Sequence, residues 1–323
     1  MRWSVMLPSL AGRWFQKRML GGTRYTLEHG SQHPARCSRA ASGRILMKRF
    51  LAVIVALFLF AALAVGGFVL LNDKLRERIG DEVTSKRCTV QGADGSVSLT
   101  AEQAQMASVV IAASLERGLP ERAAVIALAT AYQESSLRNL DHGDRDSLGL
   151  FQQRPDPRFE WGTAEQIMDP WYSSLRFYEE LVKFPDWETA DINDQAQAVQ
   201  RSGHPEAYRK HVPKAEILAA AGHGSAREAV TCMQPADLSS PISAPVEEVL
   251  SHVPGVEVTT TETSVKFTAP DEQTLWAAAQ LALLNTYQSG ISSINVQGMK
   301  YVVGETSWVA EGSSPKLTAT IYF

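Results

Sequence analysis

Hydrophobic and polar positions are distributed unevenly along this chain of 323 residues. Residues 50–71 form a run of 22 residues without a charged side chain, reading FLAVIVALFLFAALAVGGFVLL. About 20 apolar residues in a helix are enough to cross the hydrocarbon core of a bilayer. Lys48 and Arg49 stand directly before this run, and basic flanks tend to stay in the cytoplasm. The pattern predicts a single-pass cell-membrane anchor, with the N-terminus inside and residues 72–323 extracytoplasmic.

A cleaved signal peptide is the competing interpretation, because the Ala-Leu-Ala sequence ending at Ala64 resembles a cleavage site. The apolar run continues for seven residues beyond Ala64 and exceeds the apolar core of an ordinary signal peptide. We therefore favour an uncleaved anchor over residues 47–71. Residues 1–46 show no clear periodicity. They are either a basic cytoplasmic tail or an extension ahead of a true start at Met47, and the sequence leaves both open.

The first segment with a clear helix signal follows a polar stalk at residues 72–87. Thr100, with Gln103 three positions later, forms a capping box that opens a helix. Gly118 has the residue type that commonly ends one. We therefore expect a helix between these two signals.

A second helix is expected from Pro120, a residue that fits the first turn of a helix. Its apolar residues are nearly continuous over 123–131, which is typical of a helix buried on most sides. Further helical segments are expected at residues 164–184 and 194–200. Because no stretch of residues 88–233 shows the sustained alternation of a strand, we predict a mostly α domain there.

The pattern changes again toward the C-terminus. Residues 234–245 contain three prolines and three serines, a composition typical of a linker. Residues 246–323 then show strand-like alternation interrupted by one helix, which predicts a small α+β domain of roughly β-β-α-β-β-β order. The expected elements are strands at 256–258 and 265–267, a helix capped by Asp271, and strands at 291–296, 300–303 and 317–323.

Charge is also unevenly distributed. The net charge is −4, but residues 1–46 carry eight Lys or Arg and one acid, which is +7. The remaining residues therefore carry −11. Because the bulk of the protein is acidic, we expect no nucleic-acid partner.

The three cysteines differ in their predicted surroundings. Cys37 falls on the cytoplasmic side, whereas Cys88 and Cys232 fall outside, where disulfides persist. These two bracket the predicted α domain, so we expect them to be bonded and Cys37 to be free. Closing so long a loop stabilises a fold by roughly 5 kcal/mol at most in the chain-entropy description. No Cys/His cluster has metal-ligand spacing, and we expect neither a metal nor a cofactor.

Glu134 is the first candidate for catalysis. It lies at the C-terminal end of the predicted buried helix, where the helix dipole and apolar neighbours both raise the pKa of a carboxyl group. A carboxylic acid that keeps its proton near neutral pH can protonate the leaving oxygen of a glycosidic bond. The alternative is an ion pair with Arg138 one turn further on. Spacing alone does not distinguish the two.

The segment around Glu134 resembles the lysozyme-like superfamily, in particular soluble lytic transglycosylases and goose-type lysozymes. Those families carry a Glu-Ser pair at the end of a buried helix and a Gly-Leu-(Met/Phe)-Gln turn that lines the sugar cleft. The matching residues here are Glu134-Ser135 and Gly149-Leu150-Phe151-Gln152. The resemblance covers about residues 88–232. It implies a lysozyme-like fold, Glu134 as general acid, and peptidoglycan glycan strands as the partner.

Four further positions follow from the same resemblance. Asp144 lies in a Gly-Asp-Arg sequence like the one from which goose-type lysozymes position the hydrolytic water. Those enzymes carry a second acid after the turn, where this chain has Gln153. Transglycosylases carry Ala-Tyr-Asn late in the domain, where this chain has Ala-Val-Gln ending at Gln200, and Tyr208 stands where a downstream family Tyr would be. The missing second acid favours transglycosylase chemistry over hydrolysis.

Two classes of function remain at this point. The first is a peptidoglycan lytic transglycosylase or muramidase-like enzyme. The second is a catalytically silent module that binds peptidoglycan, or an envelope scaffold that meets a protein partner through residues 246–323. Trp161, Trp171 and Trp187 are candidates for stacking on sugar rings, with apolar packing as an equal alternative.

Overall fold

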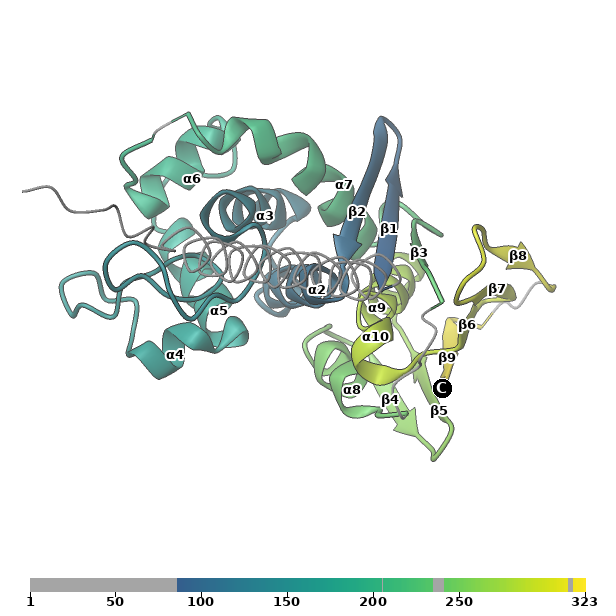
Figure 1. Ribbon diagram of the computed structural model, residues 1–323. Helices are drawn as coiled ribbons and strands as arrows, with labels where there is room; N and C mark the ends of the chain where they lie inside the picture. Colours follow the sequence, from purple (N-terminus) through teal and green to yellow (C-terminus); the bar gives the residue numbers. More distant parts are fainter. Residues whose placement is uncertain (1–85, 205, 235–240, 313–315) are drawn as a thin grey trace, which may run out of the picture. The chain divides into compact units, whose positions relative to one another are not determined.

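The computed structural model describes residues 86–204, 206–234, 241–312 and 316–323, all of which belong to one compact unit, Val69–Phe323. Within these residues the chain forms nine α-helices, one short 3-10 helix and nine strands (Figure 1). The helices are α2 (Ala101–Glu116), α3 (Glu121–Ser135), α4 (Ala164–Met168), α5 (Pro170–Leu181), α6 (Ile192–Gln200), η1 (Arg209–His211), α7 (Val212–Gly222), α8 (Ala244–Ser251), α9 (Glu272–Leu283) and α10 (Thr286–Ser289). The strands are β1 (Arg87–Gly92), β2 (Gly95–Thr100), β3 (Val230–Cys232), β4 (Glu257–Thr260), β5 (Ser264–Thr268), β6 (Ser293–Val296), β7 (Met299–Val302), β8 (Val309–Ala310) and β9 (Thr318–Tyr322).

Residues 87–232, from β1 to β3, form the helical segment. Helix α3 lies in its middle and packs against α2, α5, α6 and α7 (Figure 1). Every residue of α3 from Ala123 to Tyr132 is buried, as the continuous apolar pattern predicted. The predicted capping box is also confirmed: the Thr100 hydroxyl accepts from the Gln103 N–H, and the Gln103 side chain accepts from the Thr100 N–H. Local signals therefore determine the two helices that frame the candidate site.

The prediction of a mostly α fold preceded by a membrane helix is wrong, because two antiparallel sheets contribute to the structure. The first is a three-stranded sheet of order β2-β1-β3, built from residues predicted to be helix or loop. Its strands are short, and only Cys88, Val90, Val97 and Leu99 of the hairpin alternate into the core. Alternation over so few residues is a weak strand signal. The third strand pairs with the first only because tertiary folding brings the two together.

Cys88 and Cys232 are joined by a disulfide, as the sequence predicted. They are direct partners in the ladder between β1 and β3, and the bond closes a stretch with a sequence separation of 144 residues. Cys37 lies outside the described residues. The disulfide thus ties the first strand of the helical segment to its last one.

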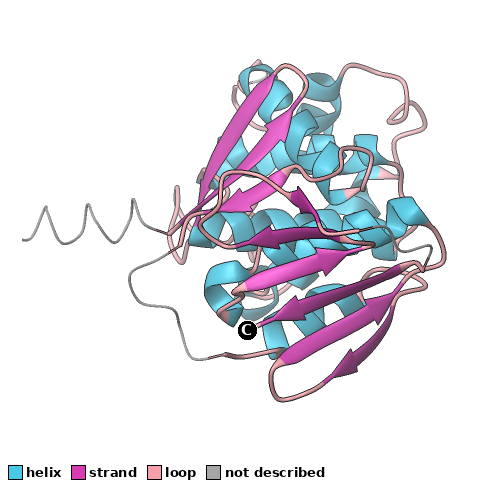
Figure 2. Ribbon diagram, turned by 90° about the vertical axis from the view of Figure 1, so that its right-hand side faces the viewer, coloured by secondary structure: helices cyan, strands magenta, loops and turns pink. Residues whose placement is uncertain are grey.

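The C-terminal segment contains the second sheet, which has six strands in the order β4-β5-β9-β6-β7-β8. Helix α9 packs on one face of this sheet, and Figure 2 shows the strands lying in front of the helices. The observed order of β4, β5, α9, α10 and then β6 to β9 agrees with the expected pattern, apart from the short helix α10 and the extra strand β8. Helix α8, which precedes the sheet, was not expected from the sequence.

Buried polar groups link the C-terminal segment to the helical segment. The amide of Gln280 on α9 accepts from Ala229 N–H at 2.8 Å and donates to the carbonyls of Ala221 at 2.7 Å and Ala226 at 2.6 Å. The Tyr301 hydroxyl accepts from Cys232 N–H at 2.6 Å and lies 2.8 Å from the carbonyl of the same residue. Side chains from the C-terminal sheet and from α9 therefore form hydrogen bonds with backbone groups of α7, of the loop after it and of β3.

The predicted membrane anchor at residues 47–71, with the tail before it and most of the stalk after it, lies outside the described residues. Among the helices that the structure describes, none is long and apolar enough to span a bilayer. The longest, α2, has 16 residues, whereas about 20 are needed. The prediction of a single-pass membrane protein is corrected accordingly. It rested on the hydropathy of residues 50–71 and on the basic residues before them, and no helix among the described residues supports it.

Candidate active site

The site begins where α3 ends. Ser136 and Leu137 both adopt left-handed backbone conformations, with φ of 56° and 59°. Their N–H groups turn back to the carbonyls of Tyr132 and Ala131, at 3.1 and 3.0 Å. This termination stops the helix directly after Ser135, so that Glu134 occupies the last helical turn with a half-buried side chain.

Ser135 joins the helix end to the turn that follows in the sequence. Its hydroxyl Oγ lies 2.7 Å from the carbonyl oxygen of Leu150, to which it donates, and accepts from the N–H of Arg138 at 3.1 Å. The side chain is almost fully buried. The two sequence motifs, Glu134-Ser135 and residues 149–152, are therefore in direct contact.

The turn over residues 149–152 is closed by a pair of backbone hydrogen bonds between Leu148 and Gln153, at 2.9 and 3.0 Å. Gly149 has a φ of +75°, and a Cβ at this position would lie 2.6 Å from the carbonyl oxygen of Ile167. Only glycine fits here without displacing α4. Leu150 and Phe151 are buried, so the turn is anchored in the core.

Two glutamine side chains, one from α6 and one from the turn itself, bond to the backbone in and beside this turn. Gln200, the last residue of α6, donates from Nε2 to the carbonyl oxygen of Phe151 at 2.8 Å. Gln152 donates from Nε2 to the carbonyls of His142 and Gly149, at 3.3 and 3.2 Å. Both were predicted to bind substrate. In this structure their amide N–H groups bond to the backbone of the protein.

Tyr208 contacts the candidate acid directly. Its hydroxyl donates to Oε1 of Glu134 at 2.8 Å, and its ring is fully buried. Tyr208 immediately precedes η1, far from Glu134 in sequence. The structure thus assigns this residue a contact with the carboxyl group, where the sequence had suggested a sugar-binding role.

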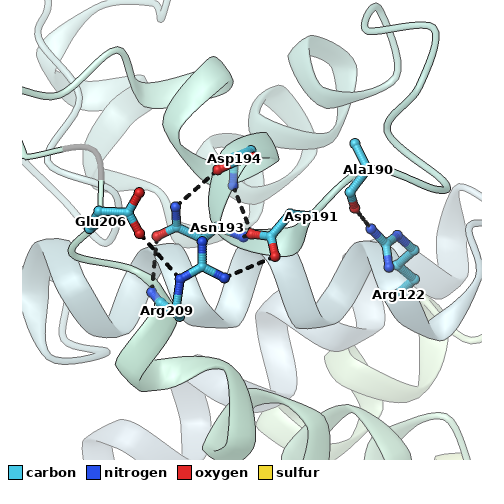
Figure 3. Close-up of polar contacts among 7 residues, drawn as sticks. All are labelled: Arg122, Ala190, Asp191, Asn193, Asp194, Glu206 and Arg209. Carbon is cyan, nitrogen blue, oxygen red and sulfur yellow. Dashed lines mark hydrogen bonds and ion pairs between the residues drawn. The ribbon is translucent and has the colours of Figure 1, made fainter.

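A polar network fixes the segment that carries Tyr208 (Figure 3). Arg209 donates from Nη1 to Asp191 at 2.9 Å and from Nε to Glu206 at 3.2 Å. The N–H of Arg209 also donates to Oδ1 of Asn193 at 3.1 Å. Because Asp191 caps the N-terminus of α6, the network ties Tyr208 to the start of the same helix that ends at Gln200.

Burial raises the pKa of the Glu134 carboxyl above its ordinary value, and the hydrogen bond from Tyr208 lowers it by a smaller amount. The expected competitor for this carboxyl was Arg138. Within the part of the chain that the structure describes, no ion pair joins Glu134 to Arg138, whose Nε bonds to the carbonyl of Ser135 instead. One carboxyl oxygen is therefore engaged by Tyr208, and no arginine neutralises the group.

Glu134 lines a cleft with a volume of about 710 Å³. Of the residues predicted to form the site, the cleft is lined by Glu134, Asp144, Phe151, Gln152, Gln153 and Gln200. The other four do not line the cleft: Ser135 and Tyr208 contact Glu134 or the turn, and Gly149 and Leu150 shape the turn itself. Asp144 shares the cleft with Glu134, but its side chain is 94% exposed, whereas that of Glu134 is half-buried.

Most of the residues that line the cleft were not predicted from the sequence. Phe159, 43% exposed, lies beneath Arg154 with 5.3 Å between the guanidinium carbon and the ring centre. Across the same cleft, Glu180 pairs with Lys183 at 2.6 Å and with Arg201 at 3.7 Å. The further lining residues not expected from the sequence are Gln133, Ser147, Arg158, Glu160, Val199 and Ser202. They come from loops and helix ends that no local pattern marks as neighbours.

The three tryptophans whose roles the sequence left open lie in different surroundings. Trp161 lines the cleft and is half-buried. Trp171 stacks on His252 with ring centres 3.8 Å apart, and Trp187 is buried. Only Trp161 of the three is therefore placed to meet a ligand in this cleft.

Metal binding has no support in the described residues, which hold no group of three His, Cys, Asp or Glu side chains that could coordinate an ion. In comparisons with known proteins, no protein-family model and no curated protein sequence matches the chain. The chemistry of the cleft is therefore argued from its own residues.

Proposed function

We propose that this protein cleaves the glycan strands of peptidoglycan, with Glu134 as the general acid. The observation that carries this proposal is the state of the Glu134 carboxyl in the cleft. Burial raises the pKa of this carboxyl, and no cation neutralises it among the described residues. A partly desolvated carboxylic acid at a polar cleft is the group that glycosidic cleavage requires at the leaving oxygen.

The hydrogen bond from Tyr208 gives the two carboxyl oxygens of Glu134 different roles. Because Oε1 accepts from the Tyr208 hydroxyl, the proton of the neutral acid resides on Oε2. That oxygen is the one that donates to the glycosidic oxygen as the bond between N-acetylmuramic acid and N-acetylglucosamine breaks. Tyr208 also stabilises the carboxylate that remains after the proton has left.

The cleft favours the transglycosylase form of this chemistry. Hydrolysis by an inverting route uses a second carboxylate that activates water. Gln153, which follows the turn, cannot serve as that base. In the transglycosylase route the Glu134 carboxylate takes the proton of the muramic C6 hydroxyl, whose oxygen then attacks C1 to form a 1,6-anhydro product. Asp144 is the residue that would orient water if water, rather than the C6 hydroxyl, attacks C1.

The test is Glu134→Gln in the full chain, assayed on purified peptidoglycan with mass analysis of the products. Gln keeps the shape but cannot donate the proton, so cleavage should fall by at least about 10²-fold. Wild-type products bearing the 1,6-anhydro ring would identify the transglycosylase route. Glu216→Gln, the same change on the exposed side of α7 away from the cleft, is the matched control and should leave cleavage unchanged.

The stability of the Gln variant supplies an independent check on folding. Because the folded-state pKa of Glu134 is raised, its contribution to stability is present below the unfolded pKa and is lost as pH rises through the folded pKa. Glu134→Gln should therefore be no less stable than wild type at neutral pH. Full activity in this variant would refute Glu134 as the acid and make Asp144 the next candidate. Binding of peptidoglycan without cleavage by the wild type would favour the silent binding module.

A further inference from the structure

A second pocket, with a volume of about 240 Å³, lies where α2, the start of α5 and α8 meet. It shares no lining residue with the cleft that holds Glu134. Among the described residues, the carboxylates of Asp169 and Glu248 line the second pocket, and no lysine, arginine or histidine does. Its wall therefore carries negative charge without a cation to balance it.

Asn285 supplies an amide oxygen to the same wall, although the residue is only 2% exposed. Its Nδ2 donates to Oγ of Ser108 at 2.9 Å and to the carbonyl of Leu281 at 3.0 Å, which fixes the orientation of the amide. Its Oδ1 accepts from no group within the described ranges. Both amide atoms of Gln153 also lack a partner, but they are shut off from solvent, whereas Oδ1 of Asn285 is not. This oxygen is therefore an oriented acceptor that a donor in the second pocket can reach.

The two carboxylates have free acceptor atoms as well. Oδ1 of Asp169 accepts from the N–H groups of Trp171 and Tyr172 at 2.9 and 3.3 Å, as the cap of α5. These bonds use the N–H groups at the helix start, which would otherwise attract an anion. Oδ2 of Asp169 and the exposed carboxylate of Glu248 bond to no group in the part of the chain that the structure describes. Both carboxylates can therefore receive hydrogen bonds from a ligand.

Trp171 adds an aromatic ring to the wall of the second pocket. Its indole stacks on the ring of His252, with ring centres 3.8 Å apart and 18° between the planes. His252 does not line the second pocket, and its Nδ1 lies 2.7 Å from Oε2 of Glu116. The stack holds the indole in place, and an indole attracts a cation that lies within about 6 Å of its ring centre.

These groups together favour an ammonium ligand. A primary ammonium carries three N–H donors and no acceptor. The second pocket offers three acceptor groups, namely two carboxylates and one amide oxygen. An anion would instead meet two like charges. The rest of the wall suits a chain of methylene groups, because it includes the apolar side chains of Met106, Val109, Pro170, Pro245 and Val249.

We propose that the second pocket binds a primary alkylammonium group between Asp169 and Glu248. The ammonium lies beside the indole of Trp171 and donates one N–H to Oδ1 of Asn285, while its alkyl chain lies against the apolar part of the wall. This binding site is separate from the chemistry of Glu134 and does not depend on the proposed function.

The experiment titrates the full chain with n-pentylamine, which is protonated at neutral pH. Binding is followed by saturation-transfer-difference NMR in phosphate buffer free of other amines. We expect a Kd of about 1 mM, because solvent screens the exposed carboxylates. The neutral 1-pentanol and the anionic pentanoate have similar chains. Both should bind about 10-fold more weakly, since they lack hydrogen bonds from a charged donor.

Two conservative variants place the ligand in the second pocket. Glu248→Gln removes one charge at an exposed position, and Asp169→Asn removes the other while keeping a residue that caps a helix well. Each should weaken pentylammonium binding about 3–5-fold. Glu247→Gln is the matched control, because Glu247 is the neighbouring acid on α8 and does not line the second pocket. It should leave the affinity unchanged.

Nα-acetyl-lysine N-methylamide distinguishes two sources of the ammonium. Binding as tight as that of pentylammonium would assign the ligand to a lysine side chain of a polypeptide, and much weaker binding would assign it to a free amine. Equal affinity for pentylammonium and 1-pentanol would overturn the inference, as would an affinity unchanged in both Glu248→Gln and Asp169→Asn. Neither outcome bears on cleavage by Glu134, since the two sites share no lining residue.

Discussion

At the scale of single residues, the contact between Tyr208 and Glu134 tunes the acid. The Tyr208 hydroxyl lowers the Glu134 pKa against the larger effect of burial. Tyr208→Phe removes this bond, so the Glu134 pKa should rise further and the acid should keep its proton to higher pH. We expect the alkaline limb of the profile of kcat/KM against pH to move to higher pH. Maximal activity should fall about 10-fold, because the carboxylate formed after proton transfer loses the hydrogen bond that stabilises it.

A tyrosine distant from the cleft provides the control for this change. Tyr178 is fully buried and donates to the carbonyl of Val110 at 2.9 Å, so Tyr178→Phe removes a buried hydroxyl without touching Glu134. Its pH profile should match that of the wild type. An unmoved alkaline limb in Tyr208→Phe would show that another group sets it.

The sequence predicted which residues belong to the site better than it predicted their contacts. Glu134 and Ser135 could be named because they form a Glu-Ser pair at the end of a predicted buried helix, as in the lysozyme-like families that the segment resembles. Tyr208 could be placed in the site, but its hydrogen bond to Glu134 depends on a network built from α6 and η1. The unpartnered state of Gln153 has no counterpart in sequence, since it depends on which groups fail to reach a buried amide.

At the scale of elements, the turn over residues 149–152 is the part most sensitive to substitution. Gly149→Ala imposes both a left-handed backbone on a non-glycine residue and a Cβ 2.6 Å from the Ile167 carbonyl. We expect a loss of about 2–4 kcal/mol in the free energy of unfolding, measured by urea denaturation, and a matching loss of cleavage.

Gly118 separates these two causes. It also has a positive φ, +64°, but a Cβ there would meet nothing within 4 Å. Gly118→Ala should therefore cost only about 1 kcal/mol. Equal losses in the two variants would mean that the approach to Ile167 is relieved at little cost, and that the turn tolerates movement of α4.

Helices were predicted better than strands for a physical reason. The start of α2 is set by Thr100 and Gln103, which are neighbours in the chain, whereas the ladder between β1 and β3 joins residues with a sequence separation of 144. The hairpin of β1 and β2 has only a few buried side chains to mark its alternation. Pairing of distant short strands leaves little trace in any local window.

At the scale of the whole molecule, Gln280 joins the C-terminal segment to the helical segment. Gln280→Met would remove the partner of the buried Ala229 N–H and of the partly buried Ala226 carbonyl, whereas the Ala221 carbonyl keeps the N–H of Gly224. At about 1–3 kcal/mol for each of the two groups that lose their partner, we expect a loss of at least about 2 kcal/mol. Urea unfolding followed by tryptophan fluorescence and by circular dichroism should show one coincident transition shifted to lower urea.

The control here is a glutamine on the same helix with a single contact. Gln273 is exposed and donates to the carbonyl of His223 at 3.0 Å in a partly buried hydrogen bond, so Gln273→Met should cost at most about 1 kcal/mol. Two separate transitions, of which Gln280→Met shifts only one, would mean that the two segments unfold independently and that Gln280 does not couple them.

The disulfide between Cys88 and Cys232 has a mechanical consequence. The chain enters the helical segment at β1 and leaves it at β3, and these adjacent strands are covalently joined. Tension applied between residue 86 and the C-terminus therefore passes across the cross-link and bypasses the helices between the two cysteines. Those residues could otherwise extend by roughly 500 Å, at about 3.3–3.6 Å for each of the 144 residues of separation. While the bond is oxidised, the cleft remains outside the load path of a stretched chain.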